Sequence, residues 1–304
     1  MGESAAQSSG YRAGRKFNVA IAGASGSVGK ELVDCMKKRE FPLGDLFLFA
    51  GSSAGKVQKT PYGDITLEAW NFDKARACDV VFLAVGGDFS REWAPKLIEP
   101  CDGKAVPVVI DNSSAFRLQK NVPLVIPEIN MSVMHDCDGL IANPNCTTAI
   151  AAMALWPLHQ KYGLERVIVS TYQAASGAGI KGPRELCEGA KLFIADEENA
   201  QHFGKVDNLP ATTFVHPLAF NLIPHIDTFQ ENGYTREEMK VTWEMRKIFG
   251  DPGPRLICFA GSLFFHFVVN LLSYVVPNLT LLSDRVLSDR VPWSLKELEK
   301  WRTK

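Results

Sequence analysis

Short apolar runs alternate with helix-forming stretches along the first half of the chain. Residues 17–22 (FNVAIA) are the first run, and residues 30–36 after them have the composition of a helix. Because such a run is apolar throughout, it predicts a strand buried on both faces. The same pattern predicts further strands over 45–50, 80–85, 106–110 and 140–142, and a helix over 89–98. Strands and helices in alternation predict an α/β fold, a Rossmann-like doubly wound parallel sheet.

The pattern changes after residue 146. A β-branched run over 166–172 predicts a strand, the glycine-rich stretch 173–179 a flexible loop, and 182–195 a helix. A further helix begins at Thr235, since threonine caps helix N-termini well. The length of 304 residues also favours about two domains.

Four segments follow from this pattern. Residues 1–16 are small and polar, so we expect them to be disordered, and they lack the apolar centre of a secretory signal. Residues 17–145 should form the α/β domain and residues 146–250 a second, α+β domain. Residues 251–304 form an apolar tail with a different character.

A glycine-rich turn follows the first predicted strand and leads into the first predicted helix. Its glycines have the spacing G-x-x-G-x-x-G, a variant of the dinucleotide-binding pattern. Glycine lets the backbone approach a pyrophosphate, which the helix N-terminus then stabilises. An ordinary tight turn is the alternative. The expected nucleotide contacts are Gly23, Ser25, Gly26, Ser27, Val28 and Gly29.

A cysteine stands at a second turn, in the sequence Asn143-Pro144-Asn145-Cys146-Thr147-Thr148. Asn-Pro opens a turn, and the alanine-rich residues behind Cys146 favour a helix. Cys146 should therefore lie in the first turn of that helix, where free N–H groups and the helix dipole favour thiolate over thiol. The sequence thus predicts a nucleophile for covalent catalysis. The alternative is a small buried apolar side chain, which is the commoner role of a free cysteine.

Two polar groups offer binding sites for anions. The segment 111–117 (DNSSAFR) follows a predicted strand, and Asn112 and Arg117 in it offer amide and guanidinium donors. Glu237 and Lys240 are three residues apart on a predicted helix, a spacing that by itself indicates a solvated ion pair.

Composition excludes several classes of function. The chain is 46% hydrophobic and 22% charged, with 33 basic and 34 acidic residues, so no excess of positive charge indicates nucleic-acid binding. The seven cysteines are scattered without C-x-x-C or zinc spacing. We expect no metal site and no disulfide framework, as in a reducing compartment.

Taken together, these motifs resemble the aspartate-β-semialdehyde dehydrogenase family of plants and bacteria. They occur in the family's order across about residues 17–250. The matching stretches are residues 23–29, 53–56, 111–117, 123–128, 143–148, 170–179, 220–222 and 237–240.

The resemblance implies an NADP-dependent enzyme that interconverts aspartyl phosphate and aspartate semialdehyde, for lysine, threonine and methionine biosynthesis. Cys146 would be the thioester-forming nucleophile, and Gln173 would orient the substrate. Phosphate and substrate would be bound by Asn112, Arg117, Glu237 and Lys240. Further cofactor contacts would be Ser52, Ser53, Ser176 and Gly177.

The same resemblance implies a partner and a location. The second domain corresponds to the family's catalytic and dimerisation domain, so a homodimer or homotetramer is expected if that domain is complete. The partners are otherwise small molecules, aspartate semialdehyde and phosphate, and not nucleic acid. The family is found in the cytoplasm or the plastid stroma.

The chain departs from the family pattern at several points. Ser52 stands where the family often has an arginine for the 2′-phosphate of NADP, which leaves the choice between NADP and NAD open. After residue 250 there is no counterpart of the segment R-V-P-V-x-R-x-H-A-E, which supplies a substrate-binding arginine and an acid/base histidine, or of the closing helix. His266 lies in a different context, so that role is not transferred to it. We therefore expect an incomplete second domain and low turnover.

The nearly continuous apolar run over 256–276 leaves three explanations open. A terminus translated from a retained intron or shifted frame is favoured, because the family pattern is lost abruptly and without a linker. The others are a displaced core segment and a membrane anchor, for which the length suffices. Two alternative functions also remain: an inactive homologue that binds nucleotide or an intact subunit, and N-acetyl-γ-glutamyl-phosphate reductase.

Overall fold

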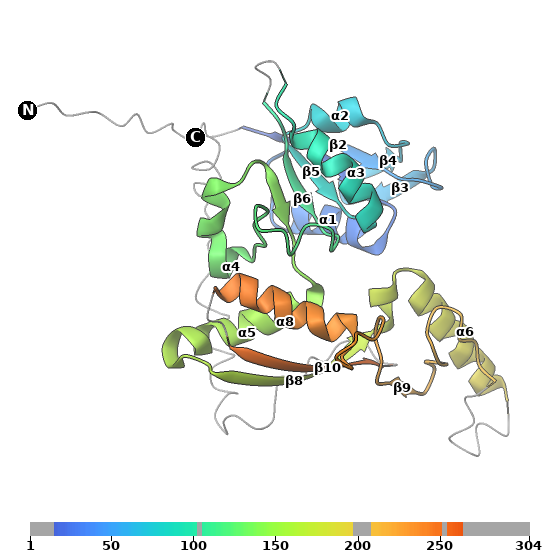
Figure 1. Cartoon of the computed structure of the whole chain (residues 1–304). Coiled ribbons are helices and arrows are strands. Elements are labelled where there is room, and N and C mark those ends of the chain that lie inside the picture. The colour runs from blue at the N-terminus through green and yellow to red at the C-terminus, as the bar shows by residue number, and fades with distance from the viewer. Residues whose placement is uncertain (1–14, 102–104, 197–207, 251–253, 264–304) are drawn as a thin grey trace, which may run out of the picture.

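The computed structural model describes residues 15–101, 105–196, 208–250 and 254–263, which fold into the two stacked domains of Figure 1. The upper domain is built on a parallel sheet of five strands in the order β2-β1-β5-β6-β7. The strands are β1 (Phe17–Ala22), β2 (Leu43–Phe49), β5 (Val80–Leu83), β6 (Val108–Asp111) and β7 (Leu140–Ala142). The doubly wound parallel sheet is therefore confirmed.

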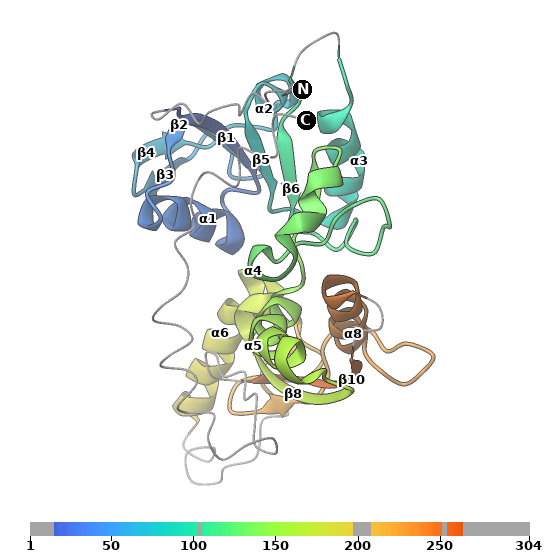
Figure 2. The ribbon, with the colours of Figure 1, turned by 90° about the vertical axis from the view of Figure 1, so that its left-hand side faces the viewer.

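The alternation of side chains along β1 explains why helices cover both faces of this sheet. Val19 and Ile21 pack with residues of α1 (Ser27–Lys38), whereas Ala20 and Ala22 pack with α2 (Phe72–Arg76) and α3 (Gly87–Ile98). Successive side chains of a strand point to opposite faces, so a wholly apolar strand requires cover on both. Figure 2 shows α1 and α3 on opposite sides of the strands.

The chain order reverses beside β1, because β2 lies on one side of it and β5 on the other. Such a switch point opens a crevice at the carboxyl ends of the strands, where ligands bind in sheets of this type. The glycine-rich turn begins there, at Gly23. The smaller elements of this domain are the hairpin β3 (Val57–Thr60) and β4 (Gly63–Thr66), α4 (Pro127–Asn130) and the 3-10 helix η1 (Met131–Asp136).

The lower domain has a three-stranded sheet in the order β8-β10-β9. β10 (Arg255–Leu263) pairs in parallel with β8 (Arg166–Ala174) and antiparallel with β9 (Leu222–Ile223). The helices α5 (Cys146–Tyr162) and α8 (Arg236–Phe249) lie together on one face of the sheet, and α6 (Lys181–Ala195) lies beside it (Figure 1). Along β8, Val167, Val169 and Thr171 are buried beneath these helices.

The structure corrects two expectations about the second domain. The predicted flexible loop 173–179 is partly regular, since its first two residues belong to β8 and η2 (Ala175–Ala178) is a 3-10 helix. The domain also continues beyond its predicted end at residue 250, because β10 belongs to the same sheet as β8. Its strand identity comes from pairing with β8 over nine residue pairs, which the local sequence does not reveal.

The terminal expectations lie mostly outside the described residues. Of the segment 1–16, only Arg15 and Lys16 are described, and Arg15 forms an ion pair of 2.9 Å with Asp79. Of the apolar run 256–276, residues up to 263 form part of β10 and the rest lies outside the description, as does His266. None of the helices in the described part of the chain is long and apolar enough to cross a bilayer.

Candidate active site

Cys146 is the first residue of α5, as predicted, and it is exposed. Asn145 before it caps the helix, because its side-chain oxygen accepts a hydrogen bond of 3.1 Å from the backbone N–H of Thr148. Unpaired N–H groups of the first helical turn remain near the thiol, and they favour an anion there. The local geometry therefore suits a nucleophilic side chain.

The carboxylate of Glu237 connects several predicted site residues. Its Oε1 accepts hydrogen bonds from Asn145 Nδ2 at 2.9 Å and from Gln173 Nε2 at 3.1 Å. Its Oε2 forms an ion pair of 3.2 Å with Lys240 Nζ. Glu237 is only 5% exposed, so the interpretation of this pair as a solvated ion pair is wrong. Gln173, Glu237 and Lys240 are therefore brought together beside the residue that precedes Cys146.

Lys240 has a second partner that the sequence did not indicate. Its Nζ lies 2.7 Å from Asp227 Oδ2. Burial alone would raise the pKa of Asp227, but hydrogen bonding and the charge of Lys240 outweigh it and hold that pKa below its ordinary value. Asp227 also has a φ of 68°, in the left-handed region. The backbone of Asp227 is thus held in an unfavourable conformation, and its carboxylate fixes the ammonium group of Lys240.

Arg117 and Asn112 form a second group at the end of β6. The guanidinium of Arg117 donates to two backbone carbonyls, from Nε to Asn143 O at 2.8 Å and from Nη2 to Asn112 O at 2.9 Å. Its Nη1 forms a buried ion pair of 3.1 Å with Glu244. Asn112 Oδ1 also accepts a hydrogen bond of 2.8 Å from Asn143 Nδ2. Because a guanidinium has five N–H groups, these three contacts leave two N–H groups of Arg117 without a partner among the residues that the structure describes.

Two residues of α8 that the sequence analysis missed link the two groups. Glu244 accepts from Asn145 N at 2.6 Å as well as from Arg117. Lys247 Nζ donates to the carbonyls of Arg117, Gln119 and Val122, at 2.9, 2.6 and 2.7 Å. The spacing 237, 240, 244, 247 follows one face of a helix. Extending the Glu237–Lys240 pair by two further turns would have indicated both residues.

The glycine-rich turn has the close packing expected of a nucleotide-binding loop. A Cβ at Gly29 would lie 2.5 Å from Gly23 O and 2.6 Å from Ala24 Cα, which are backbone atoms. Gly23 has a φ of +81°, and its added Cβ would meet Ala84 O at 2.2 Å. Gly26, Ser27 and Val28 are exposed where α1 begins. The loop thus presents helix N–H groups to solvent on a tightly packed base.

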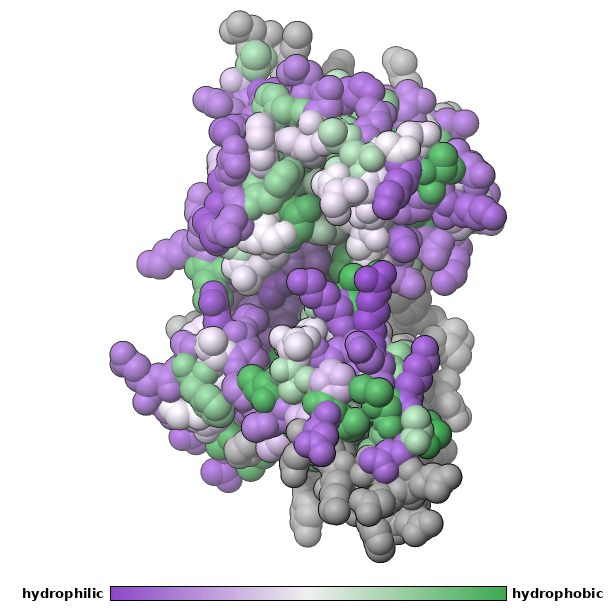
Figure 3. Space-filling model, turned by 90° about the vertical axis from the view of Figure 1, so that its right-hand side faces the viewer, coloured by the Kyte–Doolittle hydropathy of each residue, from purple (hydrophilic) through white to green (hydrophobic). Residues whose placement is uncertain are grey.

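The other predicted cofactor residues occupy separate places. Ser52 and Ser53 lie in the turn after β2, which is joined to the glycine-rich turn because Gly23 N and Ala24 N both donate to Phe49 O at 3.0 Å. Ser176 and Gly177 are exposed on η2, in the lower domain. A hydrophilic recess separates the two domains on the face seen in Figure 3.

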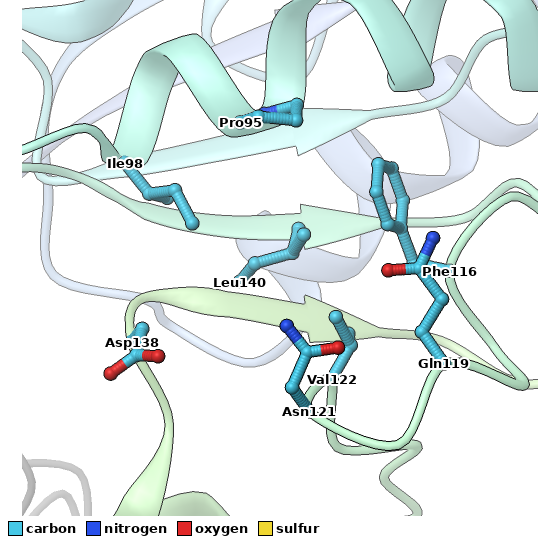
Figure 4. Close-up of a pocket in the computed structure, with 8 residues that line it drawn as sticks. All are labelled: Pro95, Ile98, Phe116, Gln119, Asn121, Val122, Asp138 and Leu140. Carbon is cyan, nitrogen blue, oxygen red and sulfur yellow. The ribbon is translucent and has the colours of Figure 1, made fainter.

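A cavity of about 140 Å³ lies elsewhere in the upper domain, between α3 and the start of β7 (Figure 4). None of the predicted site residues lines it. The residues that line this cavity are Pro95, Ile98, Phe116, Gln119, Asn121, Val122, Asp138 and Leu140.

Among the residues that the structure describes, no cluster of three or more histidine, cysteine or acidic side chains could hold a metal ion.

Comparison with known families gives two matches along the chain. The family model "Semialdehyde dehydrogenase, NAD binding domain" matches residues 18–137. The model "Semialdehyde dehydrogenase, dimerisation domain" matches residues 155–261. The second match includes most of β10, in agreement with the pairing of that strand.

Curated relatives and solved structures agree with these matches. Aspartate-semialdehyde dehydrogenase of Aquifex aeolicus is 42% identical over 239 residues, which are 77% of this chain and 66% of that protein. The enzyme of Vibrio mimicus is 42% identical over 247 residues, covering 78% and 72%. The crystal structure of aspartate semialdehyde dehydrogenase II of Vibrio cholerae complexed with ASA has a TM-score of 0.73 at 36% identity, covering 82% of this chain and 71% of that one. The chain therefore spans about two thirds of the length of such relatives.

Proposed function

Because the chain belongs to the aspartate-semialdehyde dehydrogenase family, we propose that it interconverts aspartate semialdehyde and aspartyl phosphate through a thioester on Cys146. The observation that carries this proposal is the position of an exposed thiol at the N-terminus of α5, next to the buried cluster around Glu237. A helix N-terminus favours thiolate, and thiolates attack carbonyl carbons readily.

Different side chains contribute to different steps of the reaction. In the direction of aldehyde oxidation, the Cys146 sulfur bonds to the carbonyl carbon, and that carbon gives up a hydride to leave a thioester. A phosphate oxygen then attacks the same carbon and displaces the Cys146 thiolate. Arg117 holds the phosphate with its two remaining N–H groups, supported by Lys240. Gln173, fixed by Glu237, orients the substrate carbonyl.

The glycine-rich turn suits a nicotinamide dinucleotide. The cofactor supplies the acceptor of the hydride when it is bound. Exposed N–H groups at the start of α1 fit its pyrophosphate, and the turn at Ser52, Ser53 and Lys56 lies at the adjacent strand end, where it can meet a 2′-phosphate. We therefore propose NADP as the cofactor, bound at its 2′-phosphate by hydroxyl groups and an ammonium group instead of an arginine.

Calorimetric titration with NADP and NAD in parallel should show tighter binding of NADP. The Gly29→Ala variant should lose at least about tenfold in affinity for both, because the new Cβ would displace backbone atoms of the turn. Gly261→Ala in β10 of the lower domain is the steric control, since the nearest atom to its Cβ would be Ile223 O at 3.4 Å, an ordinary contact. Equal affinities of the parent for NADP and NAD would contradict the NADP preference.

We propose that the lower domain pairs with a second copy of this chain. In support, the matched family model is that of a dimerisation domain. The face of β8 turned away from α5 and α8 also carries exposed apolar side chains, with Ile168 64% and Tyr172 40% exposed. Apolar side chains on an outer sheet face are typical of an interface.

Phosphate-dependent reduction of NADP by aspartate semialdehyde tests the proposed activity directly. We expect turnover of the 304-residue chain to be at least about 10²-fold below that of a version in which residues 264–304 are replaced by a family-type ending, which supplies an acid/base histidine. Cys146→Ser in either background should show no thioester-dependent turnover.

Other outcomes would overturn the proposal or part of it. Turnover of the parent within tenfold of the replaced version would show that another residue transfers the proton. A preference for N-acetyl-γ-glutamyl semialdehyde would indicate the related reductase. Nucleotide binding without turnover in both versions would indicate an inactive homologue.

A further inference from the structure

Glu244 is a buried carboxylate at the junction of the two groups of site residues. It is 1% exposed, and its two oxygens bind different partners, Oε1 the guanidinium of Arg117 and Oε2 the backbone N–H of Asn145. Burial raises the pKa of Glu244, while the charge of Arg117 and the hydrogen bond from Asn145 oppose that rise. A carboxylate in this position affects both the anion-binding arginine and the start of the nucleophile helix.

Arg117 does not depend on Glu244 for its orientation. Its Nε and Nη2 donate to two backbone carbonyls, which already define the plane of the guanidinium. The backbone of Arg117 is fixed as well, because Lys247 binds its carbonyl and those of Gln119 and Val122. The main effect of Glu244 on Arg117 is therefore electrostatic, since it adds a negative charge beside a cation that is held by other contacts.

We infer that Glu244 acts through Arg117 and limits the affinity of the phosphate site by neutralising the charge of that guanidinium. The inference rests on the proposed function, in which Arg117 binds phosphate. A phosphate that meets a neutral pair is held less tightly than one that meets an unpaired guanidinium. The bond from Asn145 N to Oε2 keeps the carboxylate in place when an anion arrives, so the pair stays neutral and phosphate can leave.

The test is the affinity of the full chain for inorganic phosphate, measured by calorimetry for the parent and for Glu244→Gln. Glutamine has nearly the same shape without the charge, and it keeps one oxygen for Asn145 N–H while its amide nitrogen faces the guanidinium of Arg117. Phosphate should therefore bind at least about tenfold more tightly. In the version of the chain that carries a family-type ending in place of residues 264–304, Glu244→Gln should lower the KM for phosphate. It should also lower kcat, because phosphate then leaves more slowly. Damage to the structure alone would loosen the site and raise KM.

Glu238→Gln is the matched control. Glu238 is also a buried carboxylate of α8, but its oxygens accept from Thr235 N at 2.6 Å and Ala260 N at 3.0 Å, and its hydrogen bonds involve neither Arg117 nor Asn145. Its replacement should lower stability while leaving phosphate affinity within about twofold of the parent. A comparable gain in affinity in both variants would overturn the inference.

Glu244→Asp provides a second measure if Glu244→Gln does not fold. The aspartate keeps the charge but draws it back from Arg117, so phosphate affinity should lie between those of the parent and of Glu244→Gln. Phosphate binding no tighter than in the parent in either folded variant would overturn the inference. Failure of the proposed function would look different, because turnover would then be absent while the affinities still follow this order.

Discussion

Iodoacetamide at pH 7.5 should alkylate Cys146 first among the thiols described by the structure, and should leave Cys78 and Cys258 essentially unmodified. Burial raises the pKa of both these buried thiols to about 12, and neighbouring carboxylates add to the effect. A thiol is neutral below its pKa, and only the thiolate reacts. At pH 7.5, a pKa near 12 leaves about 10³-fold less thiolate than the ordinary value of about 8.5.

Exposure alone does not single out Cys146, because Cys35, Cys101 and Cys187 are exposed too. Its advantage is its position in the first turn of α5, whereas Cys35 lies near the end of α1 and Cys187 within α6. The dipole of a helix favours an anion at the N-terminus and opposes one at the C-terminus. We therefore expect Cys146 to react several-fold faster than the other exposed thiols.

Time-resolved labelling with peptide mapping measures this order, and Cys146→Ser identifies the peptide. If Cys35, Cys101 or Cys187 is labelled first, the argument from the helix start is wrong. Rapid labelling of Cys78 or Cys258 would instead show that the native chain opens under the conditions of the experiment.

The five strands of the parallel sheet in the upper domain could be predicted from sequence, because a strand that is buried on both faces is apolar throughout. The exposed hairpin of β3 and β4 lacks such a run and was not predicted. A run such as 17–22 has no polar residue at alternate positions except Asn18, and only a strand covered on both sides fits that pattern. β10 could not be predicted in the same way. It lies at the start of a longer apolar run, and its pairing with β8, about 90 residues earlier in the chain, is decided by tertiary structure.

The site was predictable where one residue type has one evident use. Cys146 behind an Asn-Pro turn and glycines between a strand and a helix are such cases. The role of Glu244 could not be predicted from sequence, since a glutamate on a helix is usually solvated. Its role depends on Arg117, 127 residues earlier, and on the N–H of Asn145, 99 residues earlier. Only the shared helix face of residues 237, 240, 244 and 247 connects it with the predicted site.

Replacing Arg117 by methionine should cost about 3–5 kcal/mol of stability at pH 8, because it leaves the carboxylate of Glu244 buried without its counter-charge. Burial already raises the pKa of Glu244 in the native chain, and removal of the opposing charge of Arg117 would raise it further. A raised pKa means that the folded state binds more protons than the unfolded state between the two values. The contribution of this protonated group to the free energy of unfolding is then fully present at low pH, and it is lost as pH rises through the folded-state pKa.

The Arg117→Met variant should therefore be less stable at pH 8 than at pH 5.5, by a wider margin than the parent. Urea unfolding at both values measures this, with the double variant Arg117→Met/Glu244→Gln as control. The glutamine still offers an oxygen to Asn145 N–H but carries no charge, so the double variant should recover about 2 kcal/mol at pH 8 and lose the added pH dependence. A double variant no more stable than Arg117→Met would show that the cost arises from the lost contacts to Asn112 and Asn143, and not from the buried charge.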